Sequence, residues 1–97
     1  MNNKYVGIYC FEATNDKSSR LGQKYIGKSI DILSRERAHL TKLRNNKHCN
    51  PIIQNYFNKY GINSLKFYIL MECPENELNF WERFWIKCFD SQKKWIQ

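Results

Sequence analysis

Gly7-Ile8-Tyr9 and Tyr25-Ile26-Gly27 contain the same three residue types in opposite order, and each lies within a run of β-forming residues. In an antiparallel pair of strands, facing positions run in opposite directions and successive side chains alternate between the two faces. The mirrored order therefore predicts a register in which glycine faces glycine, isoleucine faces isoleucine and tyrosine faces tyrosine. Both phenols would then lie on one face, beside two glycines that leave room for a bulky group.

The sequence around these tripeptides predicts three strands. We expect the first over residues 5–13 and the second over residues 23–28, joined by a polar connection over residues 14–22 that contains turn-forming residues. A third run of β-forming residues covers residues 65–73. Because an isolated hairpin cannot bury its apolar face, the strands should form a sheet packed by helices.

Three helices are predicted from capping residues and apolar spacing. Pro51 fits the first position of the second helix. The expected helices run from the N-cap Asp31 to about residue 45, from the N-cap Asn50 to Gly61, and from residues 74–77 to about residue 89. Residues 90–97 are too few to assign. The predicted order is β-β-α-α-β-α, in one α+β domain that spans residues 1–97.

The composition indicates an acidic partner. The chain of 97 residues has 16 Lys and Arg against 9 Asp and Glu, which gives a formal net charge of +7. A small basic domain of this kind is attracted to a polyanion such as a nucleic acid. A surface that only keeps the protein in solution is the alternative, because the basic residues are spread from Lys4 to Lys94.

The four cysteines, Cys10, Cys49, Cys73 and Cys88, contain no Cys-x-x-Cys pair. This spacing argues against a zinc site. We expect reduced, mostly buried thiols in a cytoplasmic protein, because the sequence has no signal-peptide pattern. It also has no run of about 20 apolar residues, so no membrane-spanning segment is expected.

The two tripeptides, at this separation, resemble the signature of the GIY-YIG nuclease superfamily. The family pattern continues with an arginine early in the next helix, which matches Arg35, and often with a histidine one turn later, which matches His39. Glu82 matches the family's metal-binding glutamate, and His48 matches a second histidine of the homing-endonuclease branch. Either tripeptide alone is an ordinary strand sequence, whereas the ordered set is specific: Tyr9, Tyr25, Arg35, His39 and Glu82.

The resemblance covers nearly the whole chain and implies a three-stranded antiparallel sheet flanked by three helices. Residues 57–61 and 78–86 resemble the homing-endonuclease branch, with structure-specific repair and restriction types as the alternatives. Relatives of that branch usually carry a separate DNA-binding domain for specificity, so either an excised or a free-standing catalytic domain fits. The family often has an asparagine near the end of the domain, and Gln97, which stands there, is given no role. The target and the oligomeric state stay open.

Glu82 falls at the edge of an apolar stripe on the third predicted helix. At about 100° per residue, the stripe contains Leu78, Trp81, Trp85 and Phe89. A carboxylate beside a core face costs free energy unless it is paired or binds a cation. One possibility is that Glu82 has an ordinary structural role, as the partner of a nearby Arg or Lys in a salt bridge. The resemblance implies instead that Glu82 holds one Mg²⁺ or Mn²⁺ ion, together with waters and phosphate oxygens.

Arg35 and His39 lie one turn apart on the first predicted helix, and both border its buried face. An ion pair for Arg35 and a hydrogen-bonded, partly buried His39 are the ordinary structural roles. The resemblance implies instead that the planar guanidinium of Arg35 binds the scissile phosphate and stabilises its developing charge.

Strand tyrosines are usually packing residues, and Tyr9 and Tyr25 differ from the others only in their glycine neighbours and the family match. The resemblance implies that both are catalytic, and that Tyr9 activates the attacking water with help from Tyr25 and His39. With Arg35 and Glu82 this makes five predicted catalytic residues. A phenol has a pKa of about 10. A tyrosine base near neutral pH therefore needs support from Lys28, Arg35 or a bound metal ion.

The sequence as a whole predicts a metal-dependent DNA endonuclease. Two alternatives are not enzymes: a non-catalytic DNA-binding module and a purely structural domain. His48 and Lys28 are predicted auxiliary residues of the site. The residues expected to contact DNA phosphates are Lys28, Arg35, Lys47 and Lys59, with ordinary capping and solvation as the alternative for those at helix ends.

Overall fold

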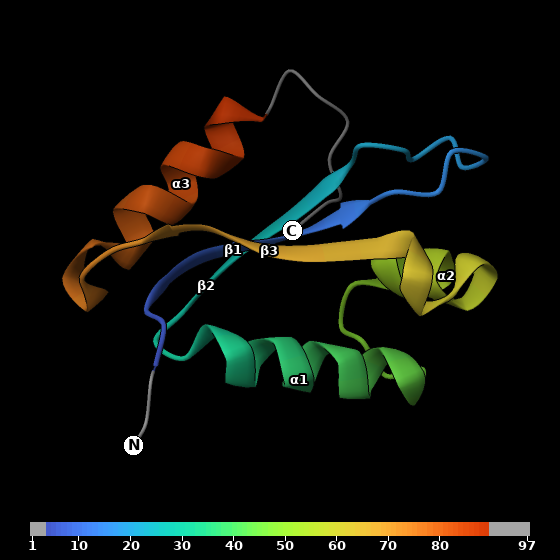
Figure 1. Ribbon diagram of the computed structural model, residues 1–97, viewed down its shortest axis with the longest axis horizontal. Coiled ribbons are helices and arrows are strands. Elements are labelled where there is room, and N and C mark those ends of the chain that lie inside the picture. The colour runs from blue at the N-terminus through green and yellow to red at the C-terminus, as the bar shows by residue number, and fades with distance from the viewer. Residues whose placement is uncertain (1–3, 90–97) are drawn as a thin grey trace.

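The computed structural model describes residues 4–89, which form one antiparallel sheet with helices on both faces (Figure 1). The strands are β1 (Gly7–Ala13), β2 (Lys24–Ser29) and β3 (Leu65–Glu72). Their order in the sheet is β2-β1-β3, so β1 is central and β2 lies at an edge. The predicted three-stranded sheet is confirmed, with strand ends displaced by one or two residues.

The three predicted helices are also confirmed, as α1 (Ile32–Arg44), α2 (Pro51–Tyr60) and α3 (Leu78–Cys88). Two short 3₁₀ turns, η1 (Ile62–Ser64) and η2 (Glu75–Glu77), precede β3 and α3 and were not among the predicted elements.

The helix ends follow the capping residues identified in the sequence. The Asp31 side chain accepts the Ser34 N–H at the start of α1. The Asn50 side chain accepts two N–H groups of the first turn of α2. Gly61 ends α2 with a φ of 84°, a conformation that favours glycine.

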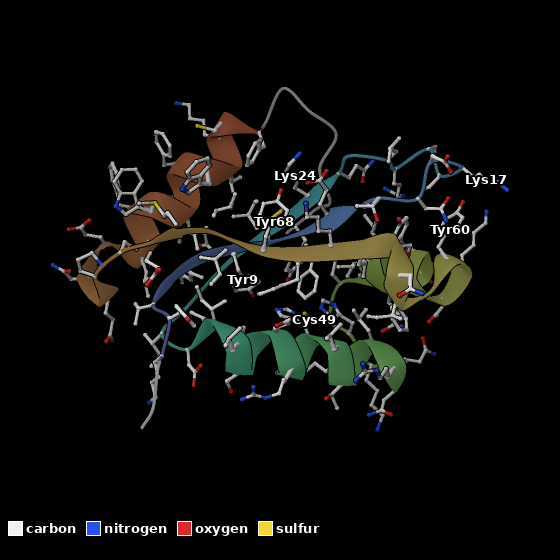
Figure 2. All side chains as sticks on the ribbon, viewed as in Figure 1. Tyr9, Lys17, Lys24, Cys49, Tyr60 and Tyr68 are labelled. Atoms are coloured by element: carbon white, nitrogen blue, oxygen red, sulfur yellow. The ribbon has the colours of Figure 1, made fainter. Side chains whose placement is uncertain are left out.

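The two faces of the sheet pack against different helices. α1 and α2 cover the face that contains Tyr9 and Phe11, and α3 covers the face that contains Ile8 and Ile26. Figure 1 shows α1 and α3 on opposite sides of the sheet. In Figure 2, Tyr9 lies on the side of α1 and Tyr68 on the side of α3.

The register between β1 and β2 differs from the predicted one by two residues. Tyr9 faces Gly27, and Phe11 faces Tyr25. Because side chains alternate with a period of two, this shift leaves every side chain on its expected face. The two tyrosines therefore share a face, but the predicted pairing of tyrosine with tyrosine and glycine with glycine is wrong. The alternating pattern cannot distinguish registers two residues apart, and the observed register places a glycine beneath the Tyr9 ring.

The two glycines make separate contacts, so the expectation that together they admit one bulky group is also wrong. A Cβ on Gly27 would lie far inside van der Waals distance of the Tyr9 ring and hydroxyl. A Cβ on Gly7 would collide instead with the backbone of Met71 in β3, next to an irregularity in the β1–β3 register between Ile8 and Tyr9. Gly27 makes room for a side chain, whereas Gly7 makes room for a neighbouring strand.

The cysteines are free thiols, but most are not buried. Cys10 is buried and Cys73 partly buried, while Cys49 and Cys88 are exposed. The expectation of mostly buried thiols is wrong because the turn after α1 and the last turn of α3 lie at the surface. Within residues 4–89, no helix combines the length and the apolar character needed to cross a membrane.

Candidate active site

A cleft of about 210 Å³ opens at the β2 edge of the sheet. Its walls come from both faces, because α1 contributes from one side and α3 from the other. The lining residues are Tyr9 from β1, Tyr25, Ile26, Gly27 and Lys28 from β2, Arg35 from α1 and Glu82 from α3. Four of the five predicted catalytic residues therefore meet in one place.

Gly27 explains how Tyr9 reaches this cleft from the central strand. The Tyr9 ring occupies the space that a Gly27 side chain would fill. The aromatic side chain can therefore cross the edge strand and line the cleft while only 2% of its surface is exposed.

A chain of hydrogen bonds leads from Tyr9 to the turn between α1 and α2. The Tyr9 hydroxyl lies 2.8 Å from Nε2 of His39, and Nδ1 of His39 lies 2.8 Å from Nε2 of His48. The backbone N–H of Asn50 donates to Nδ1 of His48 over 3.0 Å. Both imidazoles are buried. The fifth predicted catalytic residue, His39, thus lies directly behind Tyr9.

Burial keeps both imidazoles neutral near pH 7. Burial, followed by the neighbouring His48 and Arg35, lowers the pKa of His39 to about 4. Burial and then Lys42 lower the pKa of His48. Each ring therefore carries one proton, and the hydrogen-bond network assigns the nitrogen that holds it.

The backbone amide sets the direction of the whole chain. An N–H can only donate, so Nδ1 of His48 is an acceptor and its proton is on Nε2. That proton is donated to Nδ1 of His39, which leaves the His39 proton on Nε2, facing the Tyr9 oxygen. His39 in this tautomer stabilises a Tyr9 phenolate, but it cannot accept the Tyr9 proton.

The two tyrosines of the cleft differ in their surroundings. Burial raises the pKa of Tyr9 to about 12, and the Arg35 side chain opposes this shift. Burial also raises the pKa of Tyr25, which is only partly buried. The Tyr25 ring meets the rings of His39 and His48 edge-on, with centroids 5.6 and 5.8 Å away. Both phenols are therefore protonated at neutral pH in the protein alone.

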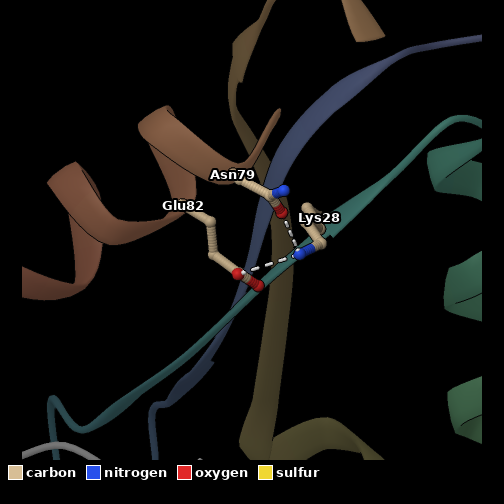
Figure 3. A network of polar contacts seen from close by, with 3 residues as sticks. All are labelled: Lys28, Asn79 and Glu82. Atoms are coloured by element: carbon tan, nitrogen blue, oxygen red, sulfur yellow. Dashed lines mark hydrogen bonds and ion pairs between the residues drawn. The ribbon is translucent and has the colours of Figure 1, made fainter. Parts of the chain in front are cut away.

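Glu82 reaches the cleft from α3 and pairs with a lysine (Figure 3). Nζ of Lys28 lies 3.5 Å from Oε1 of Glu82 and donates a hydrogen bond to the side-chain oxygen of Asn79. The Glu82 side chain is 25% exposed, which agrees with a position at the edge of the apolar stripe. The salt bridge proposed as the structural alternative is thus present, and the same carboxylate lines the cleft with Tyr9 and Arg35.

The donor set of the cleft fits a hard divalent cation bound through a single carboxylate. Within residues 4–89, no group of three or more His, Cys, Asp or Glu side chains could hold a metal ion. Both ring nitrogens of His39 and of His48 are engaged in the chain from Tyr9. Mg²⁺ is often bound through one or two carboxylates and keeps several waters. Glu82 would be the protein ligand, and water and substrate would supply the rest.

The predicted DNA contacts divide into two groups. Lys28 and Arg35 line the cleft, and both are exposed. Lys47 lies in the turn after α1, and Lys59 places its ammonium over the Tyr60 ring at the end of α2. Neither of these two lysines lines the cleft, so their contacts with DNA stay predictions.

Two residues of the site were missed in the sequence. Asn79 binds Lys28 beside Glu82, and its place one helical turn before Glu82 is a signal that could have found it. Gln54 is buried and accepts the backbone N–H of His48, which holds the turn that positions the imidazole. Gln54 had no comparable signal, because its partner is a backbone group in an irregular turn.

Comparison with known proteins identifies the family. The model of the GIY-YIG catalytic domain matches residues 5–95. A glutamate-to-alanine variant of the catalytic domain of the intron endonuclease I-TevI has a TM-score of 0.80 and 27% identity, over 95% of this chain and 92% of that one. A structure of the catalytic domain of the homing endonuclease I-TevI has a TM-score of 0.76 and 29% identity, over 90% of each chain. No curated protein sequence gives a match. The family match, the fold and the cleft together show that this chain belongs to the GIY-YIG family of nuclease domains.

Proposed function

We propose that this protein is a metal-dependent DNA endonuclease that hydrolyses a phosphodiester bond. The observation that carries the proposal is the meeting of Tyr9, Tyr25, Arg35 and Glu82 in one cleft. Membership of a nuclease family supports the reaction, and the two similar structures are named as endonucleases. The net charge of +7 supports DNA as the substrate.

The residues of the cleft divide the reaction between them. Tyr9 first loses its proton to solvent, which the Arg35 side chain and the Nε2–H of His39 favour because both stabilise the phenolate. The phenolate then accepts a proton from the attacking water. Arg35 binds the scissile phosphate and stabilises the charge that develops on it. Tyr25 lines the same wall and assists Tyr9, and solvent protonates the departing 3′-oxygen. One Mg²⁺ or Mn²⁺ ion on Glu82 would supply positive charge at that oxygen.

The experiment that tests this function is a plasmid-nicking assay with Mg²⁺, with Mn²⁺ and with EDTA. Replacing Glu82 by Ala should reduce nicking by roughly 1,000-fold or more, because the metal ligand is lost. The fold and most of the DNA affinity should remain. Glu75→Ala, which removes the same charge from an exposed residue of η2, is the matched control and should cut normally. Cleavage by Glu82→Ala at the parental rate would contradict the assignment.

We further propose that the activity is of the homing or mobile-element type. The sequence of residues 57–61 and 78–86 and the two similar structures support this branch. A chain with one site should cut one strand at a time and show weak sequence preference by itself. Cleavage of supercoiled, linear and branched DNA in parallel tests the branch. Strong selectivity for a branched substrate would favour a structure-specific repair type, and selectivity for one short sequence a restriction type.

A non-catalytic DNA-binding module is the second candidate, because the Lys28–Glu82 ion pair is complete without a metal ion. Such a module would bind duplex DNA with an affinity that falls steeply as salt rises, because cations on the protein displace counterions from the phosphates. It would leave DNA intact with every metal tested. A nick that appears with Mg²⁺ and disappears with EDTA excludes this candidate.

A further inference from the structure

A second, smaller cleft adjoins the one that holds Glu82. Its volume is about 60 Å³, and it shares Tyr25 and Arg35 with the larger cleft. Lys42, His48 and Cys49 line its far side. A space of this size holds a few water molecules or one phosphate group. The two clefts are therefore neighbouring compartments along α1, with Arg35 between them.

The second cleft differs from the first in charge. Its cationic lining residues, Arg35 and Lys42, lie on α1 and are both exposed, and none of its described lining residues is acidic. The first cleft contains the carboxylate of Glu82. The pKa of His48 is lowered mainly by burial and then by the charge of Lys42, which agrees with Lys42 lying beside this ring. Such a compartment attracts an anion and gives a metal cation no acidic ligand.

An anion in this cleft would be bound by the charged side chains and not by the imidazoles. Both ring nitrogens of His48 and of His39 are already engaged in hydrogen bonds within the protein. The Lys42 ammonium has three N–H donors, and the Arg35 guanidinium has five, enough to contact two different anions. Lys42 is therefore the charged donor that belongs to the second cleft alone.

We propose that the second cleft binds the DNA phosphate one nucleotide away from the scissile phosphate, with Lys42 as its principal donor. This inference rests on the proposed function, because it takes the larger cleft as the place of the scissile phosphate. Arg35 then lies between two successive phosphates of one strand and contacts both. The strand is held at two points, which fixes the scissile bond relative to Tyr9 and Glu82.

The test compares two probes that differ by one phosphate: thymidine 3′,5′-bisphosphate and thymidine 5′-monophosphate. Calorimetric titration in EDTA at constant ionic strength measures the binding of both without cleavage. The bisphosphate should bind about tenfold more tightly, as expected for one added charge-assisted contact. Lys42→Gln should abolish this preference, and Lys42→Arg should retain it. Lys42 is exposed, so these substitutions should leave the fold intact.

Lys17→Gln is the matched control, because it removes the same charge from an exposed lysine at the tip of the β1–β2 connection, well apart from Cys49 (Figure 2). It should keep the preference for the bisphosphate. Equal binding of the two probes by the parent protein, or a preference that survives Lys42→Gln, would overturn the inference. Failure of the proposed function looks different: the preference would persist and depend on Lys42, but no metal would support nicking.

Discussion

The two mirrored tripeptides are equivalent as sequence but not as structure. Gly7-Ile8-Tyr9 lies on the central strand, where its glycine packs against the backbone of β3. Tyr25-Ile26-Gly27 lies on the edge strand, where its glycine accommodates the tyrosine of the other tripeptide. One glycine thus serves the sheet and the other serves the site. The same residue type in a symmetric motif can therefore have two different roles, one in packing the strands and one in shaping the cleft. Substitutions at the two positions can separate these roles.

The tyrosines should show the largest difference between the tripeptides. Tyr9→Phe removes the proposed base and leaves the buried Nε2–H of His39 without its acceptor, so nicking should fall by roughly 1,000-fold. Tyr25→Phe should cost less, roughly tenfold, because Tyr25 meets the histidines only through ring edges. Single-turnover nicking rates measure both effects. Equal losses would mean that the two phenols share one task.

Substitution of Gly27, the glycine of the edge strand, should have the next largest effect. This effect should be on activity more than on stability. In Gly27→Ala the new methyl group displaces the Tyr9 ring, and a misplacement of about 1 Å can cost roughly 100-fold in rate. Stability should fall by only about 1 kcal/mol, because the obstacle is the end of a side chain that can turn away. Nicking assays and thermal unfolding of the same sample test this split. Normal activity in Gly27→Ala would show that the position of the Tyr9 ring over Gly27 is not needed for the reaction.

The central-strand glycine should show the opposite split. In Gly7→Ala the methyl group meets the backbone of Met71, which cannot turn away, so the β1–β3 pairing must shift. We expect a loss of about 1–3 kcal/mol in the free energy of unfolding, the range for overpacked sites. Activity at a temperature where the variant is folded should stay within a few-fold of the parent. A folded Gly7→Ala variant without activity would instead place Gly7 in the site.

The fold could be predicted from local signals because most of its elements are locally determined. Asp31 and Asn50 cap their helices through their own side chains, and Gly61 ends α2 by its backbone conformation. The register of β1 against β2 could not be predicted, because the alternating pattern determines the face of each residue and not its partner. The deciding contact, the Tyr9 ring over Gly27, joins two strands that are distant in sequence.

For the site, the residues that line the cleft could be predicted from the sequence, but the hydrogen bonds behind them could not. Four of the five residues that match the family pattern line the cleft, among them Arg35 and Glu82. The direction of the histidine chain was beyond the sequence, because it depends on the backbone N–H of Asn50, and every residue except proline has such a group. The position of Lys42 in the second cleft could not be predicted either, since one lysine among 16 Lys and Arg residues has no distinguishing pattern.

At acidic pH, below the range of the nicking assays, stability should depend on the tripeptide whose tyrosine hydroxyl is hydrogen-bonded to His39. The pKa of His39 is about 4 in the folded protein and about 6.5 in an unfolded chain. Between these values the unfolded chain binds more protons, so stability should fall as the pH decreases from about 6.5 towards 4 and stay level above that window. The lowered pKa of His48 acts in the same direction.

Denaturant midpoints at several pH values across this window measure the effect. His39→Gln, which cannot take up a proton, should weaken the dependence. Tyr25→Phe should leave it unchanged, because no hydroxyl of the edge-strand tripeptide is bonded to either imidazole among the described contacts. A pH dependence that weakened in Tyr25→Phe as much as in His39→Gln would link the second tripeptide to the same proton. The two tripeptides would then be alike in electrostatics even though their glycines differ in packing.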